Sequence, residues 1–293
     1  MLSSDETRAD FAADGVIVCA VVLYNRLCED AKSLSAWTGP ESYGYMLHVY
    51  DNGTIPGIKE SNRKYCADRN LPYTDMMGNR GLSAAYNAAV SELPETGRLL
   101  LLDQDTTLPE DFFPKLNASI RKYPDVPVHV PVVRSRTGIL SPASIRGHRV
   151  GRLKDIAPGI YTDITAINSG MTVQSRAYQS AGAYAEDYFL DYIDHEFIRR
   201  YRKTGGRIAV FDATLTQDFS DDDHKDRESD LVRFAIYSKD MYAFCSDTFG
   251  GRMYFCAKIF YRALKLDRIH HCGDFLKIAM KRERSQKRGR PNG

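Results

Sequence analysis

The sequence has few cysteines and no long hydrophobic run, and these absences exclude several classes of protein. Its six cysteines in 293 residues form no CxxC pair and no Cys/His set with zinc-module spacing. Neither a disulfide framework nor a zinc module is therefore expected. No 18 consecutive residues are apolar, so no transmembrane helix is encoded. We expect reduced, structural thiols in a cytoplasmic protein.

Charge is distributed unevenly along the chain. The formal net charge is +2, but residues 252–293 carry 12 Lys or Arg against three acidic residues, which leaves −7 for the rest. No basic patch or recognition motif occurs in the main part, so a nucleic-acid partner is not expected. In the tail, aromatic and basic residues alternate at near-helical spacing. This pattern is typical of a helix at the inner face of a membrane, although a packing helix with a disordered basic end fits equally well.

Short apolar segments alternate with helical ones. Residues 16–23, 45–50 and 99–102 resemble strands buried on both faces of a parallel sheet, and residues 83–93 have helical spacing. This order predicts a doubly wound α/β fold with ligands beyond the carboxyl ends of its strands. Residues 134–165 are rich in Arg, Gly, Ser and Pro, and we expect a loop-rich region there.

The strongest functional signal is a pair of aspartates after an apolar strand. Asp103 and Asp105 flank Gln104 at the end of residues 99–102. In extended backbone, residues i and i+2 face the same way, so both carboxylates can bind one hard cation, Mn²⁺ or Mg²⁺. Such an ion supports the departure of a diphosphate leaving group. A solvated turn after a strand explains the same residues without any function.

A further acidic residue lies near the start of an expected helix. Ile193, Phe197 and Tyr201 are spaced i, i+4 and i+8, which places one helix face in the core while Asp194 can project into a cleft. One carboxylate there is sufficient to deprotonate an acceptor hydroxyl in an inverting sugar transfer. The alternative is that Asp191 or Asp194 only caps the helix.

Six short motifs follow one another along the chain: Val21–Asn25, Val49–Thr54, Asn79–Asn87, Asp103–Asp105 (a DxD motif), Asn168–Gly170, and Phe189–Arg200 followed by Gly205-Gly206. In this order they resemble the inverting glycosyltransferases of family 2, nearest their rhamnosyltransferase- and galactofuranosyltransferase-like members. The resemblance covers about residues 16–220. It implies a GT-A (Rossmann-like) nucleotide-sugar-binding domain over residues 1–225, with a mostly parallel sheet, and a basic helical extension over residues 226–293.

The resemblance also implies an activity. A sugar would move from a nucleoside diphosphate sugar, dTDP-rhamnose or a UDP-sugar, to a hydroxyl of a surface polysaccharide or lipid-linked glycan. The resemblance implies that Asp194 is the catalytic base and that Asp103 and Asp105 bind the metal. It implies that Leu23, Asn25 and Asp51 hold the base and ribose of the nucleotide, and that Asn79 and Arg80 lie over the nucleotide and diphosphate. Asp103 and Gln104 are also implied to bind the donor.

One position departs from the family pattern. Where members often place a histidine metal ligand, this chain has Gln217, whose carbonyl oxygen can also bind a hard cation. Asp218 and His224 are other candidates for the third ligand. The acidic run 218–226 is otherwise typical of a solvated loop.

Two other functions fit parts of the sequence. A nucleotidyltransferase of similar fold would carry a glycine-rich loop with a basic residue after the first strand, and residues 24–27 contain no glycine. A non-catalytic carbohydrate-binding module would not need both the aspartate pair and Asp194.

Overall fold

The computed structural model describes residues 16–35, 45–217 and 226–288 of the chain. It divides the chain into two compact units. The first comprises Met1–Glu186 and Ile193–Asp218, and the second comprises Asp187–Tyr192 and Phe219–Gly293. The short segment 187–192 therefore belongs to the C-terminal unit, although it immediately precedes a helix of the first.

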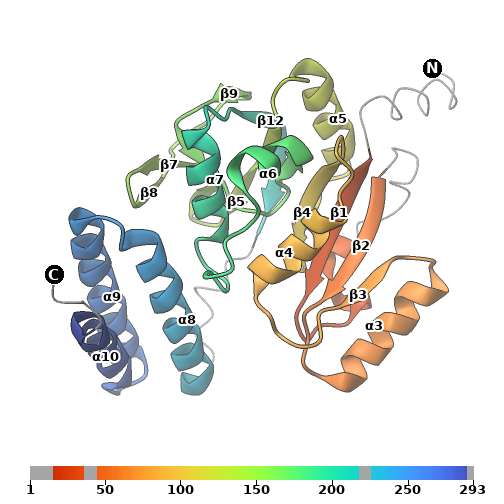
Figure 1. Ribbon diagram of the computed structural model, residues 1–293. Coiled ribbons are helices and arrows are strands. Elements are labelled where there is room, and N and C mark those ends of the chain that lie inside the picture. The colour runs from red at the N-terminus through yellow and green to blue at the C-terminus, as the bar shows by residue number, and fades with distance from the viewer. Residues whose placement is uncertain (1–15, 36–44, 218–225, 289–293) are drawn as a thin grey trace, which may run out of the picture. The chain divides into compact units, whose positions relative to one another are not determined.

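A nine-stranded sheet, as far as the described residues go, forms the centre of the first unit (Figure 1). Its strand order is β3-β2-β1-β4-β11-β5-β12-β9, and β6 pairs with β5. The bounds are β1 Ile17–Leu23, β2 Tyr45–Asp51, β3 Tyr73–Asp75, β4 Arg98–Asp103, β5 Val128–Ser135, β6 Gly138–Ser141, β9 Gly159–Tyr161, β11 Thr172–Gln174 and β12 Ile208–Thr216.

The sheet is mostly parallel, as the sequence predicts. Strands β3, β2, β1 and β4 run parallel, and so do β5 and β12, whereas β11 lies antiparallel between β4 and β5. The chain progresses from β1 to β2 and β3 on one side, and then returns to place β4 on the other side of β1. Ligands of doubly wound sheets bind beside the carboxyl ends of strands at such a reversal.

Helices cover both faces of this sheet. On one face, Cys19, Val21 and Leu100 belong to a core that includes Phe112 and Leu116 of α5. Alternate strand residues face the other way, where α4 contacts β1 and buries Tyr86. The helical elements of this unit are η1 Cys28–Asp30, α2 Lys32–Ser35, α3 Pro56–Asp68, α4 Leu82–Ser91, α5 Phe112–Lys122, α6 Ser175–Ala181 and α7 Ile193–Lys203.

The prediction of a loop-rich region over residues 134–165 is wrong. Besides β6 and β9, the segment forms a second sheet of β7 Ala143–Arg146, β8 Arg149–Arg152 and β10 Ile164–Thr165, in the order β10-β7-β8. Glycines with positive φ at the turns, 122° at Gly138 and 60° at Gly147, allow tight reversals. Strands of two to four residues are too short for an alternating pattern to show.

The C-terminal unit consists of α8 Arg227–Cys245, α9 Phe249–Ile269 and α10 Asp274–Arg288. The Asp226 carboxylate caps α8 by accepting a hydrogen bond from Ser229 N, and the Thr248 hydroxyl caps α9 by accepting one from Gly251 N. These helices confirm the helical extension expected from the sequence.

The buried carboxylate of Asp240, on α8, fixes the segment 187–192 within the helical unit. It accepts hydrogen bonds from the backbone N–H groups of Phe189, Leu190 and Asp191 at 2.8–3.2 Å. Arg233 also donates to both carboxylate oxygens of Asp191. Among the residues that the structure describes, no helix is both long enough and apolar enough to cross a membrane.

Candidate active site

Asp103 lies at the carboxyl end of β4, beside the first residues of β11. Gly170 N donates to Leu101 O at 2.8 Å, which holds the preceding Ser169 next to the strand end. One Asp103 oxygen accepts a hydrogen bond from the Tyr86 hydroxyl at 3.1 Å, and the other accepts one from the Ser169 hydroxyl. Asp103 is therefore held by side chains from two different elements.

The three predicted metal ligands lie together around Ser169. The Ser169 hydroxyl lies 3.1 Å from Gln217 Oε1, and Gln217 Nε2 lies 3.5 Å from Asp105 Oδ1. An isolated bridge between Thr107 and Thr216 brings the segment after β4 beside the end of β12, just before Gln217. Strand topology, not sequence spacing, thus unites Asp103, Asp105 and Gln217.

No basic side chain of the described residues balances the negative charge of this cluster. Burial raises the pKa of Asp103, the Ser169 hydrogen bond opposes the rise, and the charges of Asp105 and Asp194 add to it. Among the described residues, no Lys or Arg forms an ion pair with Asp103 or Asp105. A cation held by these carboxylates would offset their repulsion, so the residues present suit a divalent metal.

Few side chains are available as ligands for such a metal. Within the part of the chain that the structure describes, no group of three or more His, Cys, Asp or Glu is placed to bind a metal. A cation here would be held by Asp103, Asp105 and the amide oxygen of Gln217. The other candidates for a third ligand, Asp218 and His224, lie outside the described residues.

Asp194 is half-buried in the first turn of α7. Its Oδ1 accepts a hydrogen bond from His195 N at 2.6 Å, and Oδ2 accepts none from the described residues. The negative charge of Asp194 contributes to the raised pKa of Tyr86 and of Asp103, whose largest cause is burial. The charge of Asp194 therefore acts on the same carboxyl group as the charge of Asp105 does. The helix itself is as predicted, because Phe197 and Tyr201 are buried on its inner face.

Aromatic side chains connect the two acidic positions. The Tyr184 ring lies 5.4 Å from that of Tyr86, which binds Asp103, and 5.1 Å from that of Phe197 on α7. The Asn87 amide also pairs with the backbone of Tyr184, donating to its carbonyl and accepting from its N–H, both at 2.8 Å. This packing fixes the start of α7 against α4.

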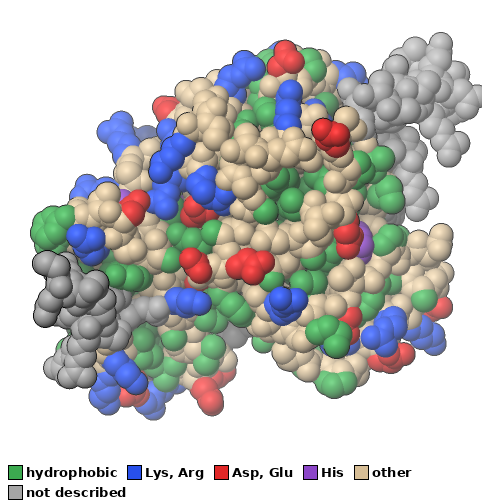
Figure 2. Space-filling view, in the orientation of Figure 1, with side chains coloured by type: hydrophobic (Ala, Val, Ile, Leu, Met, Phe, Trp, Pro, Cys, Tyr) green, Lys and Arg blue, Asp and Glu red, His purple; other side chains and the backbone are tan. Residues whose placement is uncertain are grey.

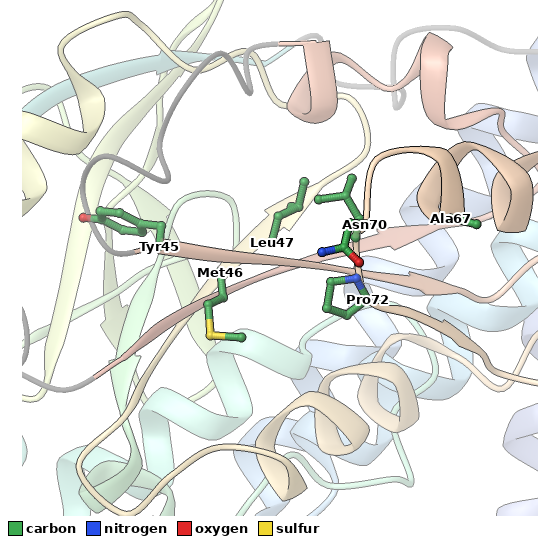
Figure 3. Close-up of a pocket in the computed structure, with 7 residues that line it drawn as sticks. Tyr45, Met46, Leu47, Ala67, Asn70 and Pro72 are labelled. Atoms are coloured by element: carbon green, nitrogen blue, oxygen red, sulfur yellow. The ribbon is translucent and has the colours of Figure 1, made fainter.

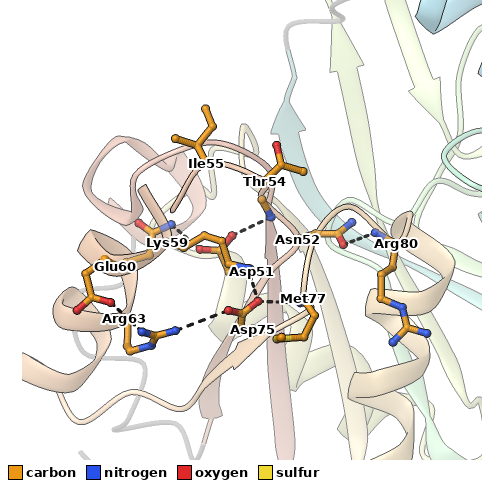
Figure 4. A network of polar contacts seen from close by, with 12 residues as sticks. Asp51, Asn52, Thr54, Ile55, Lys59, Glu60, Arg63, Asp75, Met77 and Arg80 are labelled. Carbon is orange, nitrogen blue, oxygen red and sulfur yellow. Dashed lines mark hydrogen bonds and ion pairs between the residues drawn. The ribbon is translucent and has the colours of Figure 1, made fainter. Parts of the chain in front are cut away.

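The residues predicted to hold the nucleotide base and ribose lie at the carboxyl ends of β1 and β2. Figure 4 shows Asp51 with the loop that follows β2. Leu23 is buried, and its carbonyl accepts a hydrogen bond from Asn52 N at 2.8 Å. Asn25, with φ of 49°, accepts a hydrogen bond from Thr54 N at 2.7 Å. The side chain of Asn25 thus fastens the end of β1 to the loop after β2.

Asp51 is fully buried and organises the same loop. One of its carboxylate oxygens accepts a hydrogen bond from Gly53 N at 2.9 Å. The other accepts hydrogen bonds from Asn62 at 2.9 Å and from the Tyr73 hydroxyl at 3.1 Å. The structure therefore gives Asp51 internal partners at the place where we predicted contact with a ribose.

The segment over the expected diphosphate is held by Asn52. Its Oδ1 accepts a hydrogen bond from Arg80 N at 2.8 Å, and its Nδ2 donates to Asn79 Oδ1 at 3.2 Å. The Arg80 guanidinium points away from this network (Figure 4) and is exposed, without an ion pair to any described residue. Gln104 supports the end of β1 by accepting a hydrogen bond from Tyr24 N at 3.0 Å.

Several solved structures share this arrangement of sheet and helices. Residues 1–349 of S. aureus TarS match with a TM-score of 0.52 and 16% identity, over 78% of this chain and 65% of that fragment. GalNAc-T7, solved with UDP, GalNAc and Mn²⁺, matches with a TM-score of 0.57 and 12% identity, over 88% of this chain and 58% of the other. The chain has the GT-A fold.

A third GT-A structure covers most of the chain. The mannosyltransferase PcManGT from Pyrobaculum calidifontis, solved with GDP-Man and Mn²⁺, matches with a TM-score of 0.53 and 12% identity, over 94% of this chain and 76% of the other. The chain spans less than two-thirds of TarS and GalNAc-T7. No protein-family model and no curated protein matches the sequence.

Four supporting residues of this GT-A site were not predicted from the sequence. Ser169, Tyr86 and Asn52 lie inside motifs that carry the family resemblance, but the sequence alone does not show what each side chain contacts. Asn62, on α3, lies in none of the motifs and binds both Asp51 and the carbonyl of Arg26.

A surface hollow elsewhere in the GT-A unit is not part of this site. Its volume is about 560 Å³, and its lining includes Tyr45, Met46 and Leu47 of β2 together with Asn70 and Pro72 (Figure 3). It lies at the amino end of β2, whereas the candidate site gathers at the carboxyl ends of the strands.

Proposed function

We propose that the protein is an inverting glycosyltransferase. It would transfer a sugar from a nucleoside diphosphate sugar to a hydroxyl of a surface polysaccharide or lipid-linked glycan. The observation that carries this proposal is the cluster of Asp103, Asp105 and Gln217 around Ser169 at the carboxyl edge of a GT-A sheet. Support also comes from two similar structures, which were solved with UDP or GDP-Man and Mn²⁺.

The donor's diphosphate would lie between the aspartate pair and Arg80. Mn²⁺ or Mg²⁺, held by Asp103, Asp105 and the Gln217 amide oxygen, would neutralise the diphosphate as negative charge develops on it. The exposed guanidinium of Arg80 can add charge-assisted hydrogen bonds to the phosphate oxygens. The loops fastened by Asn25 and Asn52 would present the nucleotide-binding edge in a fixed form.

Asp194 would act as the general base. Its Oδ2, which accepts no hydrogen bond from the described residues, would take the proton from the acceptor hydroxyl. The acceptor oxygen then forms a bond to the anomeric carbon while the bond to the diphosphate oxygen breaks on the opposite side. One displacement of this kind inverts the configuration, so no second carboxylate is needed. By resemblance of the motifs, dTDP-rhamnose is the first donor to test, followed by UDP-sugars.

The substitution Asp194→Asn tests the assignment of the base. We expect nucleoside diphosphate release from the preferred sugar nucleotide to fall roughly a hundredfold or more, while the affinity for the donor stays near the wild-type value. Asp125→Asn is a matched control, because Asp125 is an exposed aspartate of the same unit, and its carboxylate forms no hydrogen bond or ion pair with the described residues.

Either of two results would contradict this assignment. Wild-type turnover in Asp194→Asn would remove Asp194 from the mechanism, and loss of donor binding would give it a structural role. If the wild-type protein released a diphosphate from no sugar nucleotide in the presence of glycan acceptors, the proposed activity itself would be wrong.

A further inference from the structure

Helix α9 exposes a stripe of large apolar side chains. The exposed fractions are 73% for Phe249, 58% for Met253, 71% for Tyr261 and 48% for Leu264. At 100° per residue these positions fall on one side of the helix, opposite the buried side that includes Ile259. Helix α9 is therefore apolar both toward its own unit and toward solvent along much of its length.

Basic side chains accompany this stripe. Lys258, Lys265 and Arg268 are exposed, and none forms an ion pair with the described residues. Asp267 is the only acidic residue in α9. It is buried, and it accepts hydrogen bonds from Phe275 N and Leu276 N at the start of α10, both at 3.1 Å. The outward side of α9 therefore combines apolar side chains with positive charge alone.

Single exposed apolar residues are common on soluble proteins, but an aligned set beside lysines is typical of an interfacial helix. Four apolar positions spread over residues 249–264 extend about 22 Å along the helix at 1.5 Å per residue. Lysine and arginine stems can lie along an apolar phase while their charged ends reach the lipid headgroups. Figure 2 shows hydrophobic and basic side chains exposed on the surface of the C-terminal helices.

We propose that the outward face of α9 binds an anionic lipid surface, with the helix lying in the plane of the interface. This membrane face consists of Phe249, Met253, Lys258, Tyr261, Leu264, Lys265 and Arg268. Charge complementarity favours lipid over a second copy of the chain, because a twofold contact would bring identical lysines together without acidic partners. Such binding goes beyond sugar transfer itself and would bring the enzyme to a lipid-linked acceptor.

Vesicle sedimentation of the full chain, without any sugar nucleotide, tests this proposal. We expect binding to vesicles that contain about one-third phosphatidylglycerol, little binding to pure phosphatidylcholine, and weaker binding at higher salt. The variant Lys258→Gln/Lys265→Gln/Arg268→Gln should bind roughly a hundredfold more weakly, since each basic residue near an anionic surface contributes about fivefold. The variant Met253→Ser/Tyr261→Ser/Leu264→Ser should also lose binding.

A matched control removes the same charge from the GT-A unit. Lys64, Arg121 and Lys154 are exposed and form no ion pair with the described residues, so changing all three to Gln should leave vesicle binding within about threefold of wild type. Equal losses in control and test variants would show that net charge alone drives binding, which would overturn the proposal.

Two other results would also overturn it. One is a wild-type chain that remains in the supernatant with both kinds of vesicle. The other is a dimer, seen by light scattering, that the Ser substitutions dissociate, because the face would then join two copies of the chain. Donor affinity measured on the same variants should stay unchanged. Failure of membrane binding is therefore distinguishable from failure of the proposed enzymatic activity.

Discussion

Replacing Asp103 by Asn should stabilise the metal-free protein while abolishing its binding of metal and donor. Desolvation raises the pKa of the Asp103 carboxyl, and the negative charges of Asp105 and Asp194 add to the rise. An amide of the same shape removes the negative charge. The amide also preserves both hydrogen bonds of this side chain. The Tyr86 hydroxyl can donate to the amide oxygen, and the Ser169 hydroxyl can accept from the amide nitrogen.

The expected gain in stability is modest but measurable. Single substitutions that relieve an unfavourable interaction commonly stabilise a protein by about 0.5–2 kcal/mol. In a chain of this size, 1 kcal/mol moves the unfolding midpoint by about 2–4 °C. We therefore expect Asp103→Asn to raise Tm by about 2–4 °C at pH 7 in EDTA.

The stability gained by Asp103→Asn should depend on pH in a definite direction. Because the pKa of Asp103 is raised in the folded state, ionisation of the group destabilises the fold once the pH exceeds the ordinary value of 3.8. Below that pH the folded and unfolded chains both hold the proton, and the penalty vanishes. The difference in Tm between variant and wild type should thus be largest near neutral pH and shrink toward pH 4.

Thermal unfolding in EDTA, and again with Mn²⁺ and a nucleoside diphosphate, provides the assay. The added ligands should raise the Tm of the wild type but not that of Asp103→Asn. A lower Tm of the variant in EDTA, or a gain that is the same at pH 4.5 and pH 7, would refute the argument from charge repulsion.

Three other substitutions test separate parts of the structure. Gly170→Ala should reduce the free energy of unfolding by about 2–4 kcal/mol in urea, because φ is +76° and the new Cβ would lie 2.7 Å from Leu215 Cδ1; near-wild-type stability would contradict this. Asp240→Ala should cost about 3 kcal/mol or more, since three backbone N–H groups lose their acceptor, and an unchanged urea midpoint would count against it. Arg80→Gln should weaken donor binding in calorimetry about tenfold, while Arg121→Gln should not.

The strands of the parallel sheet were predictable because burial on both faces leaves an apolar run in the sequence. Residues 17–23 and 98–103 are nearly continuous apolar segments that end at polar residues, and the structure has strands in both places. Helix α7 was predictable for a similar reason, since its buried positions recur with helical spacing. The segment 134–165 gave no such signal, because its strands are two to four residues long between turns.

The sequence predicted individual segments of the site, but not which of them lie next to one another. Asp103 ends β4 as the apolar run predicts, but the expected extended backbone through Asp105 is wrong: Gln104 and Asp105 lie in a turn in which Thr106 N donates to Asp103 O at 3.1 Å. The proximity of both aspartates to Gln217 depends on the bridge between Thr107 and Thr216 and on Ser169 before β11. Likewise, the internal partners of Asp51 come from three different segments. Contacts between residues so far apart in the sequence are set by strand order, which local patterns do not contain.

Titration calorimetry of UDP, dTDP, GDP and CMP, each with Mn²⁺, Mg²⁺ or EDTA, tests the central claim most directly. The wild type and an Asp103→Ala/Asp105→Ala variant should be compared. We predict that one nucleoside diphosphate binds the wild type only when the metal is present, and that the double variant loses this binding. Absence of binding by all four nucleotides, or equal binding in EDTA and in the double variant, would contradict a metal-dependent sugar-nucleotide site.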